Sequence, residues 1–516
     1  MLHLGEVISS NAGLYPNKVA ARDLARSMTY RQWNDRACRL ANGLLGLGLT
    51  KGDRIAILAY NCVEWLEVYA AAAKVGLVAV PINFRLLGTE IRYILEDSGA
   101  RALVVQDSLH ERVDEILAEF AELQGRSVHF GSTNAPAGFR AYEELISAAS
   151  AAEPSVRVQP EDAWAIMYTS GTTGKPKGAI QSHRSAALIS LITALDFGFT
   201  RNDLALLVMP MCHANSLYFF ATFAYSGASC CVFDRRSFDP EELIRTLAQV
   251  RPTFTSLVPT HYILMLGLAD RVRKQHDLES LTRLLISSAS ARLDTKQGIL
   301  ENFKRSQLFE LYGSSEAGWV TILRPDEQLT KLGSVGREFT GSGRIRLLDE
   351  HGSEVPDGEV GELFSRTPYT FDGYLNLPER TTESLRDGHC TVGDMARRDS
   401  DGFYYLVDRK LNMIISGGEN VYPSEVENLL GAHPKVKDVA VIGLPHETWG
   451  ESVHAVVVLR EGQQATQQEI MDWSKDKIAG YKRPRSIAFI GEEEMPRTAT
   501  GKILHRQLRA RYGKAV

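Results

Sequence analysis

One loop in this chain combines glycine, hydroxyl and lysine side chains in a way that suits a polyphosphate. Residues 168–178 read Tyr-Thr-Ser-Gly-Thr-Thr-Gly-Lys-Pro-Lys-Gly and follow an apolar segment. Glycines let successive backbone N–H groups approach an anion closely, and the hydroxyl groups and lysines add donors and positive charge. The spacing excludes the common P-loop, whose pattern is G-x-x-x-x-G-K-[ST]. Taken alone, such a loop has an ordinary surface turn as its alternative interpretation.

Three further motifs follow in order along the chain. Leu311-Tyr312-Gly313-Ser314-Ser315-Glu316 joins an aromatic ring, a glycine, two hydroxyl groups and an acid. The second is a pair of segments, Val-Gly-Asp, which ends at Asp394, and Tyr-Leu-Val-Asp-Arg, which ends at Arg409. The third is Pro-Arg-Thr-Ala-Thr-Gly-Lys, which ends at Lys502. With the glycine-rich loop, these motifs resemble the adenylate-forming superfamily of acyl-CoA synthetases, luciferases and peptide-synthetase adenylation domains. The resemblance covers essentially the whole chain.

The resemblance implies a two-step reaction with ATP, Mg²⁺ and coenzyme A. A carboxylate attacks the α-phosphate of ATP to give acyl-AMP and pyrophosphate, and the thiol of coenzyme A then takes the acyl group. Such chemistry needs phosphate donors, a metal ligand and a cation at the transition state. The phosphate-binding positions it assigns are Thr169, Ser170, Gly171, Thr172, Thr173, Gly174 and Lys177.

Four residues are expected to be catalytic by the same resemblance. Glu316 matches the Mg²⁺ ligand, and a carboxylate beside substrate phosphates is a normal Mg²⁺ site; a helix-capping acid is the alternative. Ser315 would contact the α-phosphate, and Lys502 matches the lysine of the adenylation step. His213 would line the acyl and pantetheine region, with a core histidine as its alternative.

The remaining expected site residues bind the nucleotide, coenzyme A or the acid. The nucleotide and coenzyme A set adds Ser290, Glu310, Leu311, Tyr312, Gly313, Asp394, Arg409, Gly417 and Gly418. The acid pocket adds Asn215, Ser288, Ala289, Ala317 and Trp319 to His213. These mixed side chains do not identify the acid. A medium-chain, alicyclic or aryl acid is favoured over acetate because Trp319 is not placed to plug the pocket. Two departures from the family pattern are the Ile-Ser-Ser-Ala-Ser run at residues 286–290 and Leu411 at the expected hinge.

The chain's alternation of helix and strand patterns predicts an α/β fold. Helical spacing at residues 33–47 and 65–73 alternates with apolar strands at 54–58 and 78–82, which indicates a parallel sheet covered by helices. Period-two alternation near residues 343–349 and 360–364 predicts antiparallel hairpins. The resemblance implies a large N-terminal domain, residues 1–408, of two helix-covered sheets and a small β-barrel. A smaller mobile α+β domain, residues 409–516, would carry Lys502.

Composition excludes several classes of protein. The net charge of −5 gives no sign of a nucleic-acid partner, and no apolar run reaches the ~18 residues of a membrane span. The N-terminus lacks the pattern of a signal peptide. The six cysteines show no metal-ligand spacing, so we expect free thiols and a cytoplasmic location. The oligomeric state is left open, with a homodimer as one alternative.

These observations together favour an AMP-forming acyl-CoA synthetase whose partners are a small carboxylic acid, ATP and coenzyme A. Two alternatives stay open. An adenylating enzyme of the same family could load a carrier-protein thiol instead of coenzyme A. A non-catalytic adenylate-binding module would keep the fold without the chemistry, although the intact motifs around Glu316 and Lys502 speak against it.

Overall fold

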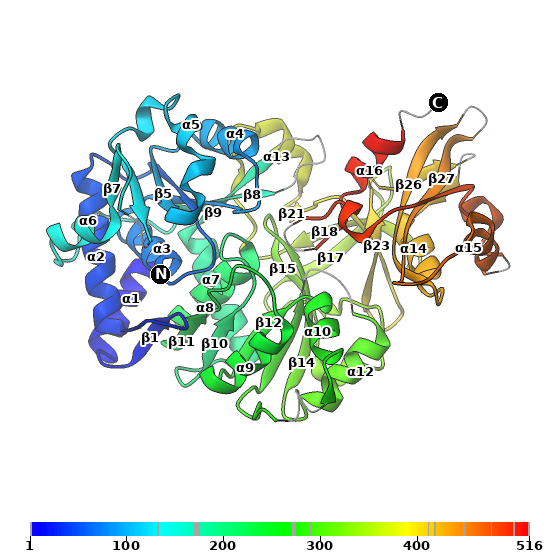
Figure 1. The fold of residues 1–516 in the computed structure, drawn as a ribbon, viewed down its shortest axis with the longest axis horizontal. Coiled ribbons are helices and arrows are strands. Elements are labelled where there is room, and N and C mark those ends of the chain that lie inside the picture. Colours follow the sequence, from blue (N-terminus) through cyan, green and yellow to red (C-terminus); the bar gives the residue numbers. More distant parts are fainter. Residues whose placement is uncertain are drawn as a thin grey trace. The chain divides into compact units, whose positions relative to one another are not determined.

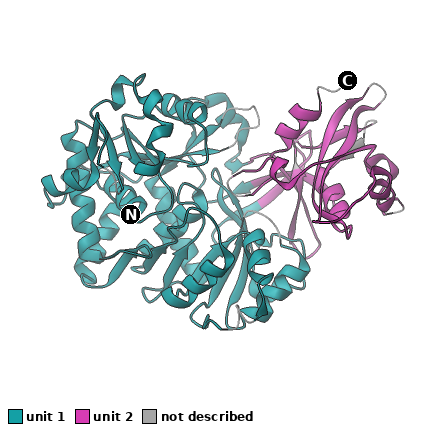
Figure 2. Cartoon of the chain, in the orientation of Figure 1, with its two compact units in different colours: residues 1–344, 365–390 teal, residues 345–364, 391–516 magenta. Residues whose placement is uncertain are grey.

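A computed structural model describes most of the chain (Figure 1). The described residues are 3–131, 134–169, 176–270, 275–287, 291–410, 412–416, 419–446, 449–475, 477–498 and 501–513, with the backbone alone at 409, 419 and 420. They form two compact units, coloured separately in Figure 2. Unit 1 comprises residues 1–344 and 365–390, and unit 2 comprises residues 345–364 and 391–516.

Unit 1 contains two large sheets. The first has eight strands in the order β19 (Gly373–Tyr374), β9 (Lys177–Ser182), β8 (Ala163–Thr169), β4 (Val78–Ile82), β3 (Arg54–Leu58), β5 (Ala102–Gln106), β6 (Ser127–Phe130) and β7 (Phe139–Ala141). The second has nine, in the order β16 (Arg337–Glu338), β15 (Gly318–Leu323), β14 (Gln307–Ser314), β13 (Arg283–Ser287), β12 (Phe254–Leu257), β10 (Leu204–Leu207), β11 (Ser229–Val232), β1 (Val19–Arg22) and β2 (Ser27–Thr29).

Helices cover both faces of these sheets because successive strand residues point to opposite sides. Ile55 and Ile57 of β3 pack into one core, while Ala56 and Leu58 pack into another. Five helices contribute buried side chains to the core between the two sheets: α1 (Leu4–Leu14), α2 (Tyr30–Gly46), α3 (Glu64–Val75), α7 (His183–Phe197) and α8 (Ala214–Tyr225). The outer face of the nine-stranded sheet is covered by α9 (Pro240–Val250), α10 (Pro259–Leu266) and α12 (Leu293–Asn302). The eight-stranded sheet is covered by α4 (Gly88–Ser98) and α5 (Asp114–Leu117).

Smaller helices complete unit 1. Tyr142 and Ile146 of α6 (Tyr142–Ala148) join the core between the sheets. The helix α13 (Pro378–Ser384) follows β19 directly.

Strand directions bring several chain segments to one edge of each sheet. β10, β12, β13 and β14 are parallel neighbours, so the residues after Leu257, Ser287 and Ser314 emerge at the same edge. β8 and β9 are antiparallel, with Thr169 opposite Lys177. The polyphosphate loop predicted from the sequence is therefore the connection of a hairpin. In open α/β sheets, ligands bind beyond the carboxyl ends of the parallel strands.

A third sheet contains the predicted hairpins. Its strands are β17 (Gly343–Leu348), β18 (Val360–Arg366), β20 (Leu385–Arg386), β21 (His389–Cys390), β22 (Asp394–Arg398) and β23 (Tyr404–Arg409). β18 pairs antiparallel with β21 and β22, and β22 pairs antiparallel with β23. The boundary between the two units falls within β18, since residues 360–364 belong to unit 2 and residues 365–366 to unit 1.

Unit 2 also contains an α+β layer. Its sheet runs β25 (Glu419–Val421), β24 (Ile414–Ser416), β27 (Gly450–Leu459) and β26 (Val436–His446), with β28 (Ser486–Phe489) paired to β27. Alternate residues of β26 and β27 face two cores. The helices α14 (Pro423–Gly431) and α15 (Gln467–Trp473) pack into one core, and α16 (His505–Tyr512) packs into the other.

The predicted fold class is confirmed. The strands predicted at 54–58 and 78–82 match β3 and β4. The helix α15 ends at Trp473, where the Ser474 hydroxyl donates to the Met471 carbonyl. The compact units divide the chain elsewhere than at 408/409, and that domain boundary stays a prediction. No helix in the described ranges has the length and apolarity to cross a bilayer.

Candidate active site

Glu316 is the centre of a hydrogen-bonded cluster in unit 1. It lies in the turn between β14 and β15 and is 5% exposed. Its Oε1 accepts a hydrogen bond from the Tyr374 hydroxyl at 2.8 Å and another from the Thr169 hydroxyl at 3.2 Å. Neutral donors therefore hold the carboxylate, and they leave its negative charge available to a cation.

The turn that carries Glu316 is fixed by close packing and by three further hydrogen bonds. A Cβ at Gly313 would lie 2.2 Å from the carbonyl oxygen of Gly318, so the two strands can approach only because residue 313 is glycine. The Gln181 side chain donates to the Ser315 carbonyl at 2.5 Å, and the Phe371 N–H donates to the Glu316 carbonyl at 2.7 Å. The backbone N–H of residue 317 donates to the Ser314 hydroxyl at 3.0 Å.

Lys177 joins the same cluster through Tyr374. β19 pairs with β9 so that Tyr374 lies opposite Ala179, two residues from Lys177. The Lys177 ammonium lies 4.1 Å from the centroid of the Tyr374 ring, which is a cation–π distance. Burial, together with the charge of Glu316, raises the pKa of Tyr374 well above its ordinary value. The Tyr374 hydroxyl therefore keeps its proton and donates a hydrogen bond to Glu316.

The donor set around Glu316 fits a Mg²⁺ ion that is shared with substrate phosphates. Mg²⁺ prefers oxygen ligands and usually takes only one or two protein carboxylates, with water and phosphate oxygens in its other positions. A buried carboxylate beside the hydroxyl of Thr169 supplies such oxygens. In the described part of the chain, no group of three or more His, Cys, Asp or Glu side chains could form an all-protein metal site.

Asn215, one of the predicted acid-pocket residues, forms a polar cluster with Ser256 and Ser287, which we call the polar wall. Asn215, near the start of α8, donates from Nδ2 to the Ser256 hydroxyl at 3.0 Å. The Ser256 hydroxyl lies 3.3 Å from that of Ser287. Ser256 belongs to β12 and Ser287 ends β13, so the three polar side chains connect α8 with neighbouring strands. His213 is the N-cap residue of α8 and is half-buried.

Two other predicted pocket residues are held by the core. The Trp319 indole is 5% exposed and donates to the Thr193 hydroxyl of α7 at 3.0 Å. Its ring packs edge-on against Tyr218, at 5.3 Å between centroids. Ala317 is buried, and its carbonyl accepts from the Thr367 hydroxyl at 2.7 Å. Trp319 therefore packs in the core with α7 and α8, and its place in the acid pocket stays a prediction.

The predicted nucleotide strand contains a buried ion pair that the sequence did not reveal. Leu311, Tyr312 and Gly313 lie near the end of β14, and Glu310 precedes them. The Glu310 carboxylate lies 2.6 Å from the Lys296 ammonium of α12, with side-chain exposures of 3% and 0%. Glu310 was predicted to bind the nucleotide. Its side chain is buried against Lys296, and a contact with the nucleotide stays a prediction.

Unit 2 holds the remaining described motif residues. Asp394 begins β22 and lies directly opposite Arg409 of β23. This register places the two expected ribose-binding residues side by side on neighbouring strands. Lys502 is exposed, and its backbone forms a tight pair with Thr498: the Thr498 N–H donates to the Lys502 carbonyl at 2.7 Å, and the Lys502 N–H donates to the Thr498 hydroxyl at 3.1 Å.

Several predicted residues lie outside the described residues, so their roles stay predictions. They are Ser170, Gly171, Thr172, Thr173, Gly174, Ser288, Ala289, Ser290, Gly417, Gly418 and the side chain of Arg409. Sequence reasoning also missed Tyr374, Ser256 and Lys296. Tyr374 lies 58 residues from Glu316 along the chain, and only the pairing of β19 with β9 brings the two together. No local pattern could have identified it.

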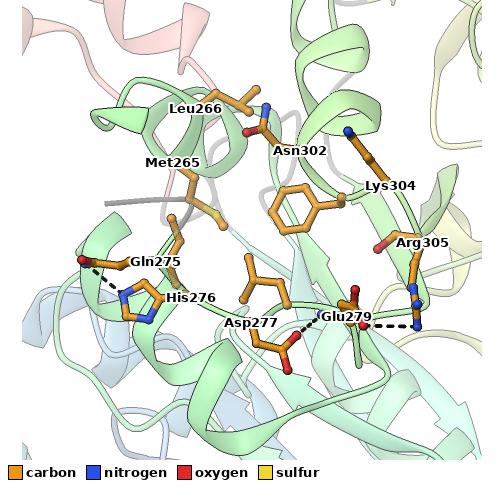
Figure 3. Close-up of a pocket in the computed structure, with 13 residues that line it drawn as sticks. Met265, Leu266, Gln275, His276, Asp277, Glu279, Asn302, Lys304 and Arg305 are labelled. Carbon is orange, nitrogen blue, oxygen red and sulfur yellow. Dashed lines mark hydrogen bonds and ion pairs between the residues drawn. The ribbon is translucent and has the colours of Figure 1, made fainter. Parts of the chain in front are cut away.

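A separate cavity of about 610 Å³ lies at the opposite ends of the strands (Figure 3). Its lining includes residues 275–279 and 302–306, which precede β13 and β14. On its rim Glu279 pairs with Arg305 at 3.3 Å, and Asp277 accepts from the Glu279 N–H at 2.9 Å. Glu279 and Arg305 neutralise each other, and the motif residues of unit 1 lie at the carboxyl ends of the strands, away from this cavity. The cavity therefore has no part in the chemistry derived above.

The chain is similar to proteins of one enzyme family over almost its whole length. A family model described as AMP-binding enzyme matches residues 8–375, and one described as AMP-binding enzyme C-terminal domain matches residues 425–502. A feruloyl-CoA synthase of Amycolatopsis sp. is 36% identical over 99% of this chain and 99% of its own length.

Two solved structures are similar over almost the whole chain. An anthranilate CoA ligase in complex with anthranoyl-AMP has a TM-score of 0.89 at 28% identity, covering 100% of this chain and 98% of that one. An O-succinylbenzoate coenzyme A synthetase from Bacillus subtilis, in complex with ATP and a magnesium ion, has a TM-score of 0.85 at 28% identity, covering 98% and 99%. Other relatives are ligases of indoleacetate and of long-chain fatty acids, so the comparisons do not identify the acid.

Proposed function

The chain belongs to the family of AMP-binding, adenylate-forming enzymes, and from this premise we propose that its substrate is an aryl acid with a polar substituent. As an AMP-forming acyl-CoA synthetase, the enzyme uses ATP with Mg²⁺ and transfers the acyl group to coenzyme A. The family leaves the acid open, because its members act on aryl acids and on fatty acids alike.

The polar wall formed by Asn215, Ser256 and Ser287 carries the proposal for the acid. The Asn215 amide donates one N–H to Ser256. A plain alkyl chain against this wall would cover the other N–H and the amide oxygen without giving them hydrogen bonds, which costs free energy. A ring with a hydroxyl, methoxy or amino substituent offers partners to the same groups. Feruloyl and anthranoyl groups, named for two of the similar proteins, have this chemistry.

In this proposal the cluster around Glu316 prepares the adenylation step. Glu316 would hold Mg²⁺, which when bound screens the charge between the carboxylate substrate and the triphosphate. Thr169 and Lys177 lie at the two ends of the phosphate loop and would bind the phosphates of ATP from both sides. Lys502 would stabilise the charge that develops on the α-phosphate. Asp394 and Arg409 would bind the ribose hydroxyl groups.

A set of matched acids tests the proposed substrate. We expect kcat/KM, measured by pyrophosphate release, to be higher for 4-hydroxy-3-methoxycinnamate than for cinnamate, and lowest for octanoate. Asn215→Leu should reduce the preference for the substituted ring about 10-fold, because loss of one buried hydrogen bond costs about 1–2 kcal/mol. Octanoate as the best substrate, or an unchanged preference in Asn215→Leu, would contradict the proposal. Product mass with coenzyme A confirms the thioester in each case.

A further inference from the structure

We propose that Tyr374 is a positioning residue that fixes the Mg²⁺-binding carboxylate of Glu316 and links it to the phosphate-binding Lys177. The inference rests on the proposed roles of Glu316 and Lys177. None of the sequence motifs contains Tyr374. Its role follows from one side chain that contacts both partners in the buried floor of the site.

Both contacts of Tyr374 are specific in geometry. Its hydroxyl donates to Glu316 Oε1 at 2.8 Å, and its ring centroid lies 4.1 Å from the Lys177 ammonium. The Thr169 hydroxyl reaches the same Oε1 at 3.2 Å. Because both donors bind Oε1, they fix the rotation of the carboxylate and leave Oε2 as the oxygen that can face a cation.

The chemical type of residue 374 suits this task. A carboxylate that must bind Mg²⁺ has to be oriented without being neutralised. An arginine or lysine at this position would compete with the cation for the negative charge, whereas a phenol donates a hydrogen bond and adds no charge. The face of the same ring attracts the Lys177 ammonium through its quadrupole. A single tyrosine can therefore hold an anionic group and a cationic group a short distance apart.

The backbone around Tyr374 is fixed to both elements that it serves. The Phe371 N–H donates to the Glu316 carbonyl at 2.7 Å, and the Leu375 N–H donates to the Gly178 carbonyl at 2.8 Å. The Tyr374 N–H donates to the Thr381 hydroxyl at 2.9 Å. Residue 373 has φ +135°, and a Cβ there would lie 2.9 Å from Thr381, so glycine is needed for this approach. The strand thus ties the Glu316 turn to the start of β9.

Tyr374→Phe removes the hydroxyl and keeps the ring, which isolates the contact with Glu316. Tyr369→Phe is the matched control: Tyr369 is buried nearby, and its hydroxyl donates to the Trp319 carbonyl at 2.8 Å. We expect Tyr374→Phe to raise the Mg²⁺ concentration for half-maximal pyrophosphate release about 10-fold, as for loss of one hydrogen bond to a charged group. Mn²⁺ binding to the enzyme with a non-hydrolysable ATP analogue, followed by electron paramagnetic resonance, should weaken by a similar factor.

The outcomes separate this inference from the proposed function. If Tyr374→Phe matches wild type or Tyr369→Phe in Mg²⁺ activation and Mn²⁺ binding, Tyr374 is only a core residue and the inference is wrong. Glu316→Gln is the reference variant. If it too keeps wild-type metal dependence, the role of Glu316 itself fails. Tyr374→Leu also removes the ring and should raise the KM for ATP several-fold beyond Tyr374→Phe; equal KM values would overturn the link to Lys177.

Discussion

Breaking the Lys296–Glu310 ion pair should destabilise the strand that carries the nucleotide motif. The two charged atoms lie 2.6 Å apart, and their side chains are 0% and 3% exposed. Glu310→Gln removes one charge and leaves the other buried without compensation, which costs about 3–5 kcal/mol. Replacing both partners by apolar side chains removes the ion pair and also the free-energy cost of burying two charges. The double variant Lys296→Met/Glu310→Leu should therefore recover most of the loss.

Local stability is the quantity to measure, because a chain with two compact units does not unfold as one two-state system. Hydrogen exchange of peptides from β13 and β14 reports the free energy of opening at this strand. We expect Glu310→Gln to lower it by about 3 kcal/mol or more and the double variant by about 1 kcal/mol. A loss below about 1 kcal/mol in Glu310→Gln, or equal losses in both, would refute the reasoning.

The same pair of variants tests whether Glu310 contacts the nucleotide. If its role is structural, the KM for ATP should rise in Glu310→Gln through the loosened strand and return toward the wild-type value in the double variant. A double variant that regains stability and still binds ATP as poorly as Glu310→Gln would instead support direct contact with the nucleotide.

Two further predictions concern the chemistry and the pH dependence. Lys502→Ala should slow carboxylate-dependent pyrophosphate release by about 10²–10³-fold and still convert presynthesised acyl-AMP and coenzyme A at near wild-type rate; comparable losses in both half-reactions would contradict a role confined to adenylation. Burial, with a contribution from the charge of His3, lowers the pKa of His183 to about 3 from 6.5. Its stabilising effect is therefore complete above pH 6.5 and falls as the pH drops toward 3, since the unfolded chain binds the proton more readily. The free energy of opening at α7, measured by hydrogen exchange at pH 7 and pH 5, should differ less in His183→Leu than in wild type or in a His351→Leu control at an exposed site. An unchanged difference would refute the lowered pKa of His183.

The agreement between sequence and structure is closest where the signal is local. The strands at 54–58 and 78–82 match because a short apolar segment between turn signals defines a buried strand without reference to the rest of the chain. The helix α2 matches for the same reason, since its apolar residues recur at helical spacing.

By itself, the sequence determined the family and the positions of most motif residues. The order of four short motifs, from Thr169 to Lys502, identifies an adenylate-forming enzyme because each motif keeps chemically required residue types at fixed spacing. Composition and periodicity also determined the α/β class. These properties need no knowledge of which distant segments meet.

Tertiary structure alone decided which side chains complete the site. Tyr374 reaches Glu316 and Lys177 because β19 pairs with β9, and Lys296 meets Glu310 because α12 packs on the face of β14. Asn215 joins Ser256 and Ser287 through the packing of α8 against two strands. Such contacts join residues far apart in the chain, and their geometry depends on close packing of the whole unit. No local pattern of residue types records them.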